Sequence, residues 1–418
     1  MKGIHLSPPP TQTTNTIQLQ TFPTTTTNPN QVQFLPFQTK HNNKKKKPKT
    51  PILCLSSTNP SKIHPQPPLV VVGSANADIY VEIDRLPKEG ETLPAKTGQT
   101  LAGGKGANQA ACGGKLSYPT YFVGQVGQDS YGKLVTEALR SGGVCLDHVT
   151  TISGGTPTGH AVVMLQSDGQ NSIIVVGGAN MSCWPEILPQ HDLDVVRNAG
   201  IVLLQREIPD AVNIQVAKVG FSLSKAIAFC VSSVPVGFLF EYAARSAGVP
   251  VIFDAGGMDS PIPQELLNYV DILSPNETEL GRLTGMATES FEDIAQAAAK
   301  CHKWVSSVLH LGHHEMLFCI TFLGVKQVLV KLGEKGSALF IEGEEPIQQP
   351  AIFAKKVLDT TGAGDTFTAA FAVALVEGKS KKECLKFAAA AASLCVQVKG
   401  AIPSMPDRKS VLELLNYH

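Results

Sequence analysis

The chain of 418 residues has no excess of either sign of charge, because 35 Lys and Arg side chains balance 35 Asp and Glu side chains. Bulk electrostatics therefore favour neither nucleic acid nor an anionic membrane as a partner. The nine cysteines include no Cys-x-x-Cys pair and no spacing typical of a metal site. This scatter indicates reduced thiols in a compartment without structural disulfides.

Acidic residues are missing from the N-terminal segment, where none occurs before Asp78. Residues 1–65 are rich in Thr, Pro, Asn and Gln, include the run Lys44–Lys47, and lack the apolar stretch of a secretory signal. We expect this segment to be disordered, because it buries too little apolar surface to offset its ordering entropy. We interpret it as a plastid transit peptide processed near Ile52–Ser56, which predicts the plastid stroma, with the cytosol as the alternative. A nuclear localisation signal at the lysines is the competing interpretation.

The rest of the chain has the pattern of an α/β fold. Short continuous apolar runs predict buried parallel strands at Leu69–Gly73, Ile201–Leu204, Val249–Phe253, Ile272–Leu273 and Val328–Val330. Helical patterns lie between and after them, at Gly132–Arg140, Glu277–Leu283, Phe291–His302, Phe367–Val376 and Lys382–Val396. The alternation predicts a doubly wound, mainly parallel sheet flanked by helices, with ligands beyond the carboxyl ends of the strands.

Two further segments predict a small second sheet that acts as a lid. Short strands separated by turn residues are expected at Ile79–Ile83 with Thr92–Gln99, and at His160–Leu165 with Ser172–Val176. We therefore predict one domain over residues 66–418, with lid strands at about 79–100 and 158–177.

A glycine-rich turn precedes the helical run at Phe367. Gly362 and Gly364 bracket Ala363, and such a turn lets the backbone approach a ligand closely. A helix that begins there points free N–H groups at the ligand, which predicts an anion site. Asp365 would repel an anion, so we interpret it as a base that takes a proton from a nucleophile attacking a phosphoryl group. The alternative is that Asp365 only caps the helix.

Three other groups of polar residues have an ordinary structural explanation beside a functional one. Asn76 and Asp78 follow the first strand and could bind neighbouring hydroxyls of a polyol, or form an Asx turn. The stretch Gly103–Asn108 resembles a P-loop only superficially, because Gln99 stands where a Walker motif has glycine; it suits a turn against a sugar. Asn276 and Glu279 could hold hydrated Mg²⁺, or form a capping box.

Together these motifs resemble the PfkB carbohydrate kinases, over about Leu69 to Leu415, and most closely a plant, plastid-targeted member of the branch that acts on D-ribose. The residues that carry the resemblance are Gly73-Ser74-x-Asn76-x-Asp78, Gly103-Gly104-Lys105-Gly106-Ala107-Asn108-Gln109-Ala110, Pro275-Asn276-Glu277-Thr278-Glu279 and Asp359-Thr360-x-Gly362-Ala363-Gly364-Asp365-Thr366-Phe367.

The resemblance implies ATP-dependent phosphorylation of D-ribose at its 5-hydroxyl, with Asp365 as the base and the amides of Gly362, Ala363 and Gly364 as the anion hole. It further implies a sugar site at Asn76, Asp78, Gly104, Lys105, Asn108, Glu207 and Asp365. The nucleotide would lie along Asn276, Lys331, Gly333, Gly336 and Gly364, and Mg²⁺ would be served by Glu279. The resemblance also implies a monovalent cation, normally K⁺, held at Asp359, Thr361, Cys395, Val398, Gly400 and Ser404, and a homodimer formed through the lid strands.

Two apolar, charge-poor segments do not fit the family. Residues 219–242 and 304–323 show neither helical nor strand periodicity, and we hypothesise that both are translated intron sequence that forms poorly packed loops. The alternatives are a membrane span in the first, which Lys225 disfavours, and a metal site at His310, His313 and His314 in the second.

Other functions stay open on the sequence alone. A fructokinase or nucleoside kinase of the same family would share these motifs. A catalytically silent plastid scaffold of the same fold would be expected to have lost Gly362, Gly364 or Asp365, and all three are present.

Overall fold

The structure is a computed structural model that describes residues 66–167, 171–220, 248–304, 308–313, 316–321 and 325–417. The predicted transit peptide at 1–65 lies outside the described residues. So does the predicted insertion at 219–242, apart from its first two residues. None of the helices that the structure describes is long and apolar enough to cross a membrane.

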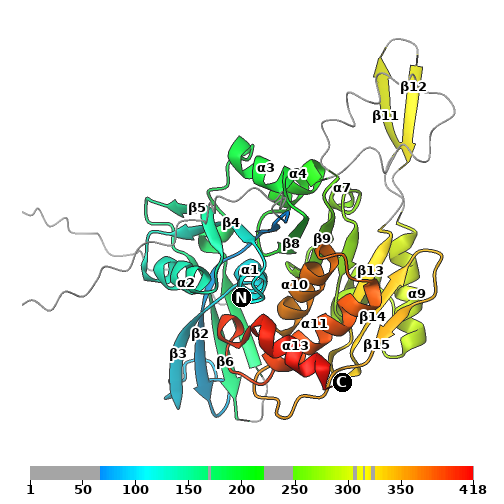
Figure 1. The fold of residues 1–418 in the computed structure, drawn as a ribbon. Coiled ribbons are helices and arrows are strands. Elements are labelled where there is room, and N and C mark those ends of the chain that lie inside the picture. The colour runs from blue at the N-terminus through cyan, green and yellow to red at the C-terminus, as the bar shows by residue number, and fades with distance from the viewer. Residues whose placement is uncertain are drawn as a thin grey trace, which may run out of the picture. The chain divides into compact units, whose positions relative to one another are not determined.

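A nine-stranded sheet forms the centre of the fold (Figure 1). Its strands lie in the order β15-β14-β13-β10-β9-β8-β1-β4-β5. All neighbours pair in parallel except β14 and β15, which add an antiparallel edge. The predicted fold class and all five predicted core strands are confirmed. In chain order the strands are β1 (Leu69–Val72), β4 (Thr120–Gly127), β5 (Cys145–Ile152), β8 (Ile201–Arg206), β9 (Val251–Gly257), β10 (Ile272–Ser274), β13 (Gln327–Lys331), β14 (Ser337–Ile341) and β15 (Ile347–Gln349).

Helices cover both faces of this sheet. In β1, Leu69 and Val71 pack on one side and Val70 and Val72 on the other, because successive side chains of a strand point to opposite faces. The first face is covered by α1 (Lys105–Lys115), α2 (Ser130–Ser141), α10 (Ala363–Val376), α11 (Lys381–Cys395), α12 (Ala401–Ser404) and α13 (Arg408–Asn416). The second is covered by α3 (Gln190–Arg197), α4 (Asp210–Gly220), α7 (Gln264–Leu267), α8 (Glu277–Thr284) and α9 (Phe291–His302).

The lid is a four-stranded sheet in the order β3-β2-β6-β7. Its strands are β2 (Asn76–Ile83), β3 (Thr97–Gly103), β6 (Gly159–Gln166) and β7 (Asn171–Val176). The second strand was predicted at Thr92–Gln99, and in the structure it begins five residues later and ends four residues later. It runs on to Gly103 because its last residues pair with the start of β2. The lid therefore reaches into the glycine-rich stretch that precedes α1.

Part of the second predicted insertion forms a β-hairpin. Strands β11 (Val308–His313) and β12 (Met316–Thr321) pair antiparallel with each other, in a sheet separate from the other two. This corrects the expectation of loops without strand structure. Pairing satisfies the backbone N–H and C=O groups of two adjacent segments whatever the periodicity of their side chains.

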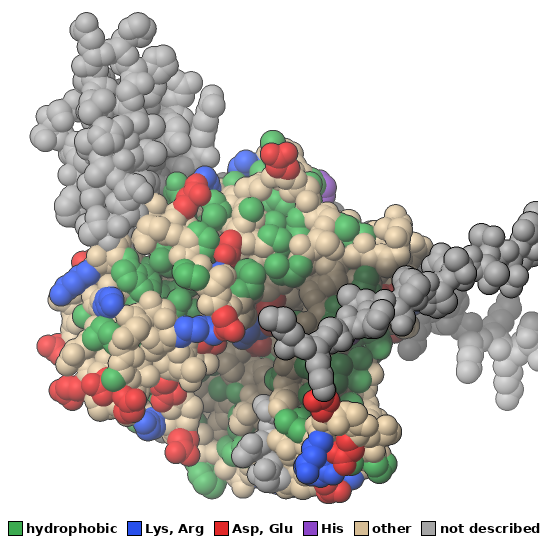
Figure 2. Space-filling view, turned by 180° about the vertical axis from the view of Figure 1, so that it is seen from behind, with side chains coloured by type: hydrophobic (Ala, Val, Ile, Leu, Met, Phe, Trp, Pro, Cys, Tyr) green, Lys and Arg blue, Asp and Glu red, His purple; other side chains and the backbone are tan. Residues whose placement is uncertain are grey.

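Charged side chains of both signs are interspersed on the face shown in Figure 2. Several acidic side chains lie together at the lower left of this view, with basic side chains next to them.

Candidate active site

The predicted site residues gather beyond the carboxyl end of β1. This strand lies between β8 and β4. The sheet continues from it with β4 and β5 on one side and with β8, β9 and later strands on the other, so the strand order reverses at this point. Such a topological switch point opens a crevice for ligands in doubly wound folds. The ends of β8, β9, β10 and β13 lie on the same edge of the sheet, because these strands are parallel to β1 or to its neighbours.

Asp365 lies in the first turn of α10 and is 5% exposed. Its carboxylate accepts hydrogen bonds from Asn108 Nδ2 at 2.9 Å and from Gln109 Nε2 at 3.3 Å, both on α1. These two bonds join the Asp365 carboxylate to α1 and not to the backbone of its own helix, which argues against the alternative that it only caps the helix. Burial raises the pKa of Asp365 above its ordinary value; Lys105 acts in the opposite direction and Asp254 adds to the rise.

The turn before α10 has the backbone geometry that its glycines predict. Gly362 has φ +77°, a conformation that favours glycine, and it immediately precedes the helix. The Ala363 amide donates to Thr360 O at 3.2 Å within the turn. We had expected all three amides of the turn to be available to an anion, and the structure engages that of Ala363 internally. The helix end still places positive dipole beside the carboxylate of Asp365.

Lys105 is a cation at the centre of several carboxylates. Its Nζ lies 3.8 Å from Oδ1 of Asp365 and 3.8 Å from Oδ1 of Asp254. Burial acts to lower its pKa, yet Asp365, Asp254, Glu207 and Glu279 raise it above the usual lysine value. Lys105 therefore stays protonated, and it offsets repulsion among groups that would otherwise resist ionisation.

The end of β1 and the start of β2 bring the predicted sugar-binding residues together. Asn76 and Asp78 are 4% and 8% exposed, in consecutive inward positions of β2. Asn76 belongs to the strand, so the alternative of an Asx turn does not apply. Glu207 follows β8, and its carboxylate accepts from Ser74 Oγ at 2.6 Å and from the Lys105 amide at 3.0 Å. Gly104, with φ +90°, has no room for a Cβ, which would lie 2.7 Å from the Asn76 amide nitrogen.

Asp78 carries a strongly perturbed carboxyl group. Its burial, with repulsion from Glu207 and Asp365, raises its pKa to about 7. A folded-state pKa above the unfolded value stabilises the fold at low pH, and this contribution is lost as the pH rises through 7.

We therefore predict that Asp78→Asn gains stability over the unsubstituted chain as the pH rises. Because asparagine does not ionise, the difference in free energy of unfolding should shift in its favour by up to about 3 kcal/mol between pH 5 and pH 8. Urea unfolding of the ligand-free proteins measures this. Asp84→Asn, in the exposed segment just after β2, serves as the control without a gain. Stability curves of wild type and Asp78→Asn that run parallel across this range would contradict the assignment.

Asn276 and Glu279 form the capping box that was the alternative to a metal site. Asn276 Oδ1 accepts from the Glu279 amide at 2.7 Å, and Glu279 Oε2 accepts from the Asn276 amide at 2.9 Å. The second oxygen, Oε1, points to the β9 end, where a Cβ on Gly256 would lie 2.8 Å from it. The box therefore leaves one carboxylate oxygen of Glu279 facing Lys105 and the site.

Lys331, the last residue of β13, has its Nζ 2.7 Å from Asp254 Oδ2. It also lies against the anion turn, since a Cβ on Gly364 would be 3.9 Å from this Nζ. Gly333 and Gly336 flank a short 3₁₀ turn, with φ +53° and +103°. These predicted nucleotide residues thus form a backbone turn that leads from the anion turn along the sheet edge.

All six residues predicted to hold a monovalent cation lie in two adjoining segments. Asp359 accepts from the amides of Thr361 at 2.9 Å and Gly400 at 2.8 Å. Cys395 Sγ lies 3.0 Å from Ser404 Oγ, and the Val398 amide donates to Cys395 O at 3.1 Å. The structure therefore brings the set together behind the anion turn, with one carboxylate and several backbone oxygens among its donors.

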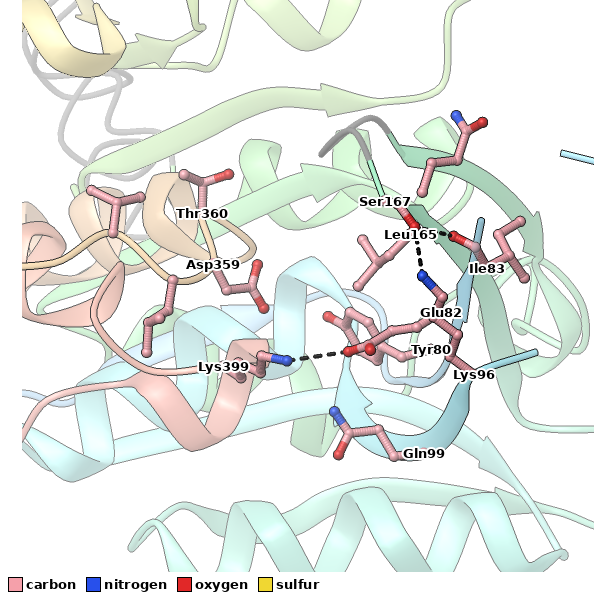
Figure 3. Close-up of a pocket in the computed structure, with 13 residues that line it drawn as sticks. Tyr80, Glu82, Ile83, Lys96, Gln99, Leu165, Ser167, Asp359, Thr360 and Lys399 are labelled. Atoms are coloured by element: carbon pink, nitrogen blue, oxygen red, sulfur yellow. Dashed lines mark hydrogen bonds and ion pairs between the residues drawn. The ribbon is translucent and has the colours of Figure 1, made fainter. Parts of the chain in front are cut away.

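A pocket of about 530 Å³ lies between the lid and residues 357–360 (Figure 3). Among the predicted site residues within the described chain, Asp359 is the one that lines it. Lys399 Nζ reaches Glu82 on β2 across it at 3.1 Å. Tyr80, also on β2, is buried, and desolvation, with the nearby Asp78 charge, raises its pKa to about 12.

One other cluster in the described residues has metal-binding side chains. Asp192 Oδ1 lies 2.8 Å from His148 Nδ1 and 3.2 Å from His191 Nε2, on the edge strand β5 and helix α3. The histidines 310 and 313 considered from the sequence lie on β11, and His314 lies outside the described residues.

Sequence reasoning missed Asp254, which is fully buried in the middle of β9. Although burial disfavours its charged form, Lys331 and Lys105 hold its pKa below the ordinary value. Its position directly after an apolar run and before two glycines was the available signal. Gln109 and Gln205 were also missed: Gln205 Nε2 donates to Gln109 Oε1 at 2.6 Å, which continues the hydrogen-bond chain behind Asp365.

The chain is similar to known proteins in family, in sequence and in structure. The family described as pfkB family carbohydrate kinase matches residues 66–408. A ribokinase of Arabidopsis thaliana is 68% identical over 353 residues, which are 84% of this chain and 82% of the relative. A ribokinase of Bacillus subtilis is 33% identical over 83% of this chain and 99% of its own length.

Solved structures agree with these matches. The structure of Arabidopsis thaliana ribokinase complexed with ribose and ATP has a TM-score of 0.71 and 68% identity to this chain. The match covers 84% of this chain and 99% of that one.

Proposed function

Because the chain belongs to the pfkB family of carbohydrate kinases, we propose that it transfers the γ-phosphoryl group of ATP to the 5-hydroxyl of D-ribose. The products are ribose 5-phosphate and ADP. The high identity to a ribokinase whose structure holds ribose and ATP supports this substrate pair. The observation that carries the proposal is the buried carboxylate of Asp365, held by Asn108 at the start of α10 beside a glycine-rich turn.

The reaction follows from this arrangement. The ribose 5-oxygen forms a bond to the γ-phosphorus as the bond to the β-phosphate oxygen breaks, and Asp365 accepts the hydroxyl proton. The positive end of α10 and the amides of Gly362 and Gly364 stabilise the charge that develops on the phosphoryl oxygens. Phosphoryl transfer needs little covalent chemistry from a protein, so positioning and charge stabilisation carry most of the acceleration.

The ligands are assigned to the two sides of this turn. The sugar lies under the lid against Asn76, Asp78, Gly104, Lys105, Asn108 and Glu207. The nucleotide lies along Asn276, Lys331, Gly333, Gly336 and Gly364. Support comes from Lys105 and Lys331, whose ammonium groups flank Asp254 between the two sides.

Two metal ions complete the proposed site. Glu279 has one carboxylate oxygen outside its capping box, which suits Mg²⁺ held mostly through water and phosphate. When bound, that ion neutralises phosphate charge. The set around Asp359 offers oxygen donors suited to a hard monovalent cation such as K⁺, and its place behind the anion turn would stiffen that turn.

We also propose a homodimer formed through the lid. Strand β7 is an edge of the four-stranded sheet and exposes four consecutive apolar residues, Ile173–Val176, at 41–58%. An exposed apolar edge strand favours pairing with a second chain.

The plastid location and the insertions remain proposals from the sequence. Both insertions fall between elements of the fold: α4 ends at Gly220 and β9 begins at Val251, whereas α9 ends at His302 and β13 begins at Gln327. We infer that they are translated intron sequence, which an mRNA lacking both segments would support.

The test is ATP-dependent phosphorylation of ribose, fructose and adenosine, with and without K⁺. We expect ribose-selective, K⁺-stimulated activity. A chain that begins near Pro65 and lacks 219–242 and 304–323 should be more active than the full chain, because long apolar insertions consume the small stability margin of a domain. Preference for fructose or adenosine would identify another kinase of the family. A folded but inactive trimmed chain would favour the silent scaffold.

A further inference from the structure

Asn180 has a buried side-chain amide that connects the segment after β7 with the segment where β1 leads into β2. It ends the short 3₁₀ turn η1 (Gly178–Asn180) that follows β7, and it is 2% exposed. Its side chain contacts Ala75 and Asn76, where the chain passes from β1 into β2. No sequence motif had singled it out.

The orientation of the Asn180 amide is determined by backbone groups. Its Oδ1 accepts from the Ala75 amide at 2.9 Å, and its Nδ2 donates to the Ala75 carbonyl at 3.2 Å. A backbone N–H can only donate and a carbonyl can only accept. The reverse orientation of the amide would break both bonds, so oxygen and nitrogen are assigned without ambiguity.

This orientation propagates to Asn76. The second proton of Asn180 Nδ2 is donated to Asn76 Oδ1 at 2.6 Å. The oxygen of Asn76 is thereby occupied, and its Nδ2 is the end of the amide left to meet a ligand. Gly159 on β6 packs directly against this hydrogen bond and leaves no room for a side chain. A Cβ there would lie 2.0 Å from Asn180 Nδ2 and 2.4 Å from Asn76 Oδ1.

A donor at this position complements the carboxylates of the sugar site, where the ammonium group of Lys105 is a second donor. Asp78, Glu207 and Asp365 present carboxylates, which when ionised only accept hydrogen bonds. Each sugar hydroxyl has a single proton, so a hydroxyl that donates to a carboxylate needs a donor as its second partner. If the Asn76 amide were inverted, its Oδ1 and the carboxylate would both need the single proton of the same sugar hydroxyl. One of these two buried acceptors would then have no hydrogen bond.

We propose that Asn180 is a positioning residue that sets Asn76 as a hydrogen-bond donor to the sugar. The inference rests on the proposed sugar kinase function and adds to it a residue that acts through another. Asn180 touches neither the phosphoryl group nor the base in this arrangement, so it should affect sugar binding more than turnover.

The test is the nearly isosteric substitution Asn180→Asp, assayed with ATP and ribose. A carboxylate oxygen then replaces Nδ2, which inverts the Asn76 amide. We expect KM for ribose to rise at least about tenfold, as loss of one buried hydrogen bond predicts, with kcat changed less than about threefold. Asn198→Asp, at an exposed asparagine after α3, is the control without effect.

A double-mutant cycle separates positioning from general damage. In chains that already carry Asn76→Ala, adding Asn180→Asp should raise KM less than about twofold further, because the group through which it acts is gone. An equal rise in both backgrounds would overturn the proposal. If Asn180→Asp does not fold, Gly159→Ala displaces the same contact and is put through the same cycle. A wild-type chain inactive on ribose would overturn the proposed function and this inference together.

Discussion

Asp365→Asn is expected to keep the fold and to lower turnover with ATP and ribose by on the order of 10²-fold or more. Asparagine has nearly the same shape but cannot take the proton of the 5-hydroxyl. The substitution removes a charge that burial already disfavours, because the pKa of Asp365 is raised. Thermal stability should therefore be preserved, and kcat at saturating substrates measures the loss.

The control is another aspartate at the same helical position. Asp293 is the third residue of α9, as Asp365 is of α10, and it contributes to a capping box there. Asp293→Asn should leave turnover normal, which separates loss of a base from loss of a helix-end carboxylate. Near-normal turnover in Asp365→Asn would exclude the base assignment.

Lys105→Met is expected to impair both the site and the fold. Without this cation, Asp365, Asp254, Glu207 and Glu279 face one another with less compensation. Removing one partner from a buried charge pair costs about 3 kcal/mol or more, because the other charge stays behind. Catalytic efficiency with ribose should fall on the order of 10²–10³-fold, the effect typical of losing one preorganised charge-stabilising group.

The pH dependence of kcat/KM tests this prediction most directly. Lys105 favours the charged form of Asp365, so its loss should move the acid limb of kcat/KM to higher pH. Lys133→Met, at an exposed site on α2, is the matched control that should change neither efficiency nor profile. An unshifted acid limb in Lys105→Met would show that the cation does not govern the base.

The sequence predicted the elements whose apolar pattern is continuous. β1, β8, β9, β10 and β13 were found because buried parallel strands read as unbroken runs. β4 and β5 were missed, since glycine and polar residues interrupt the first and the second is a partly exposed edge strand. Helix α1 is absent from the helices predicted by apolar periodicity. Its three glycines lower helix propensity, and it is stabilised by packing that buries most of its residues.

The candidate site was predictable where residues stand in motifs at strand ends. Asn76, Asp78, Lys105, Asn108 and Asp365 were each expected at the site and do lie together there. Asp254 and Asn180 were missed, because their partners come from distant parts of the chain and single polar residues leave no pattern. The Asn276 motif illustrates the opposite limit, since a capping box and a metal site demand the same residues.

Three lid strands meet at one row, where Asn76 pairs with Gly103 on one side and with Gly159 on the other. That row is also where the sugar is proposed to bind, so the lid is joined to the rest of the domain at residues that contact the substrate. A rotation of the lid about this row would displace the residues of the row least and the residues at the other end of β2 and β6 most. Within the lid, the row at Asn76 thus lies beside the proposed sugar site, whereas Ile83 and Gln166 end β2 and β6 at the opposite end of the paired strands.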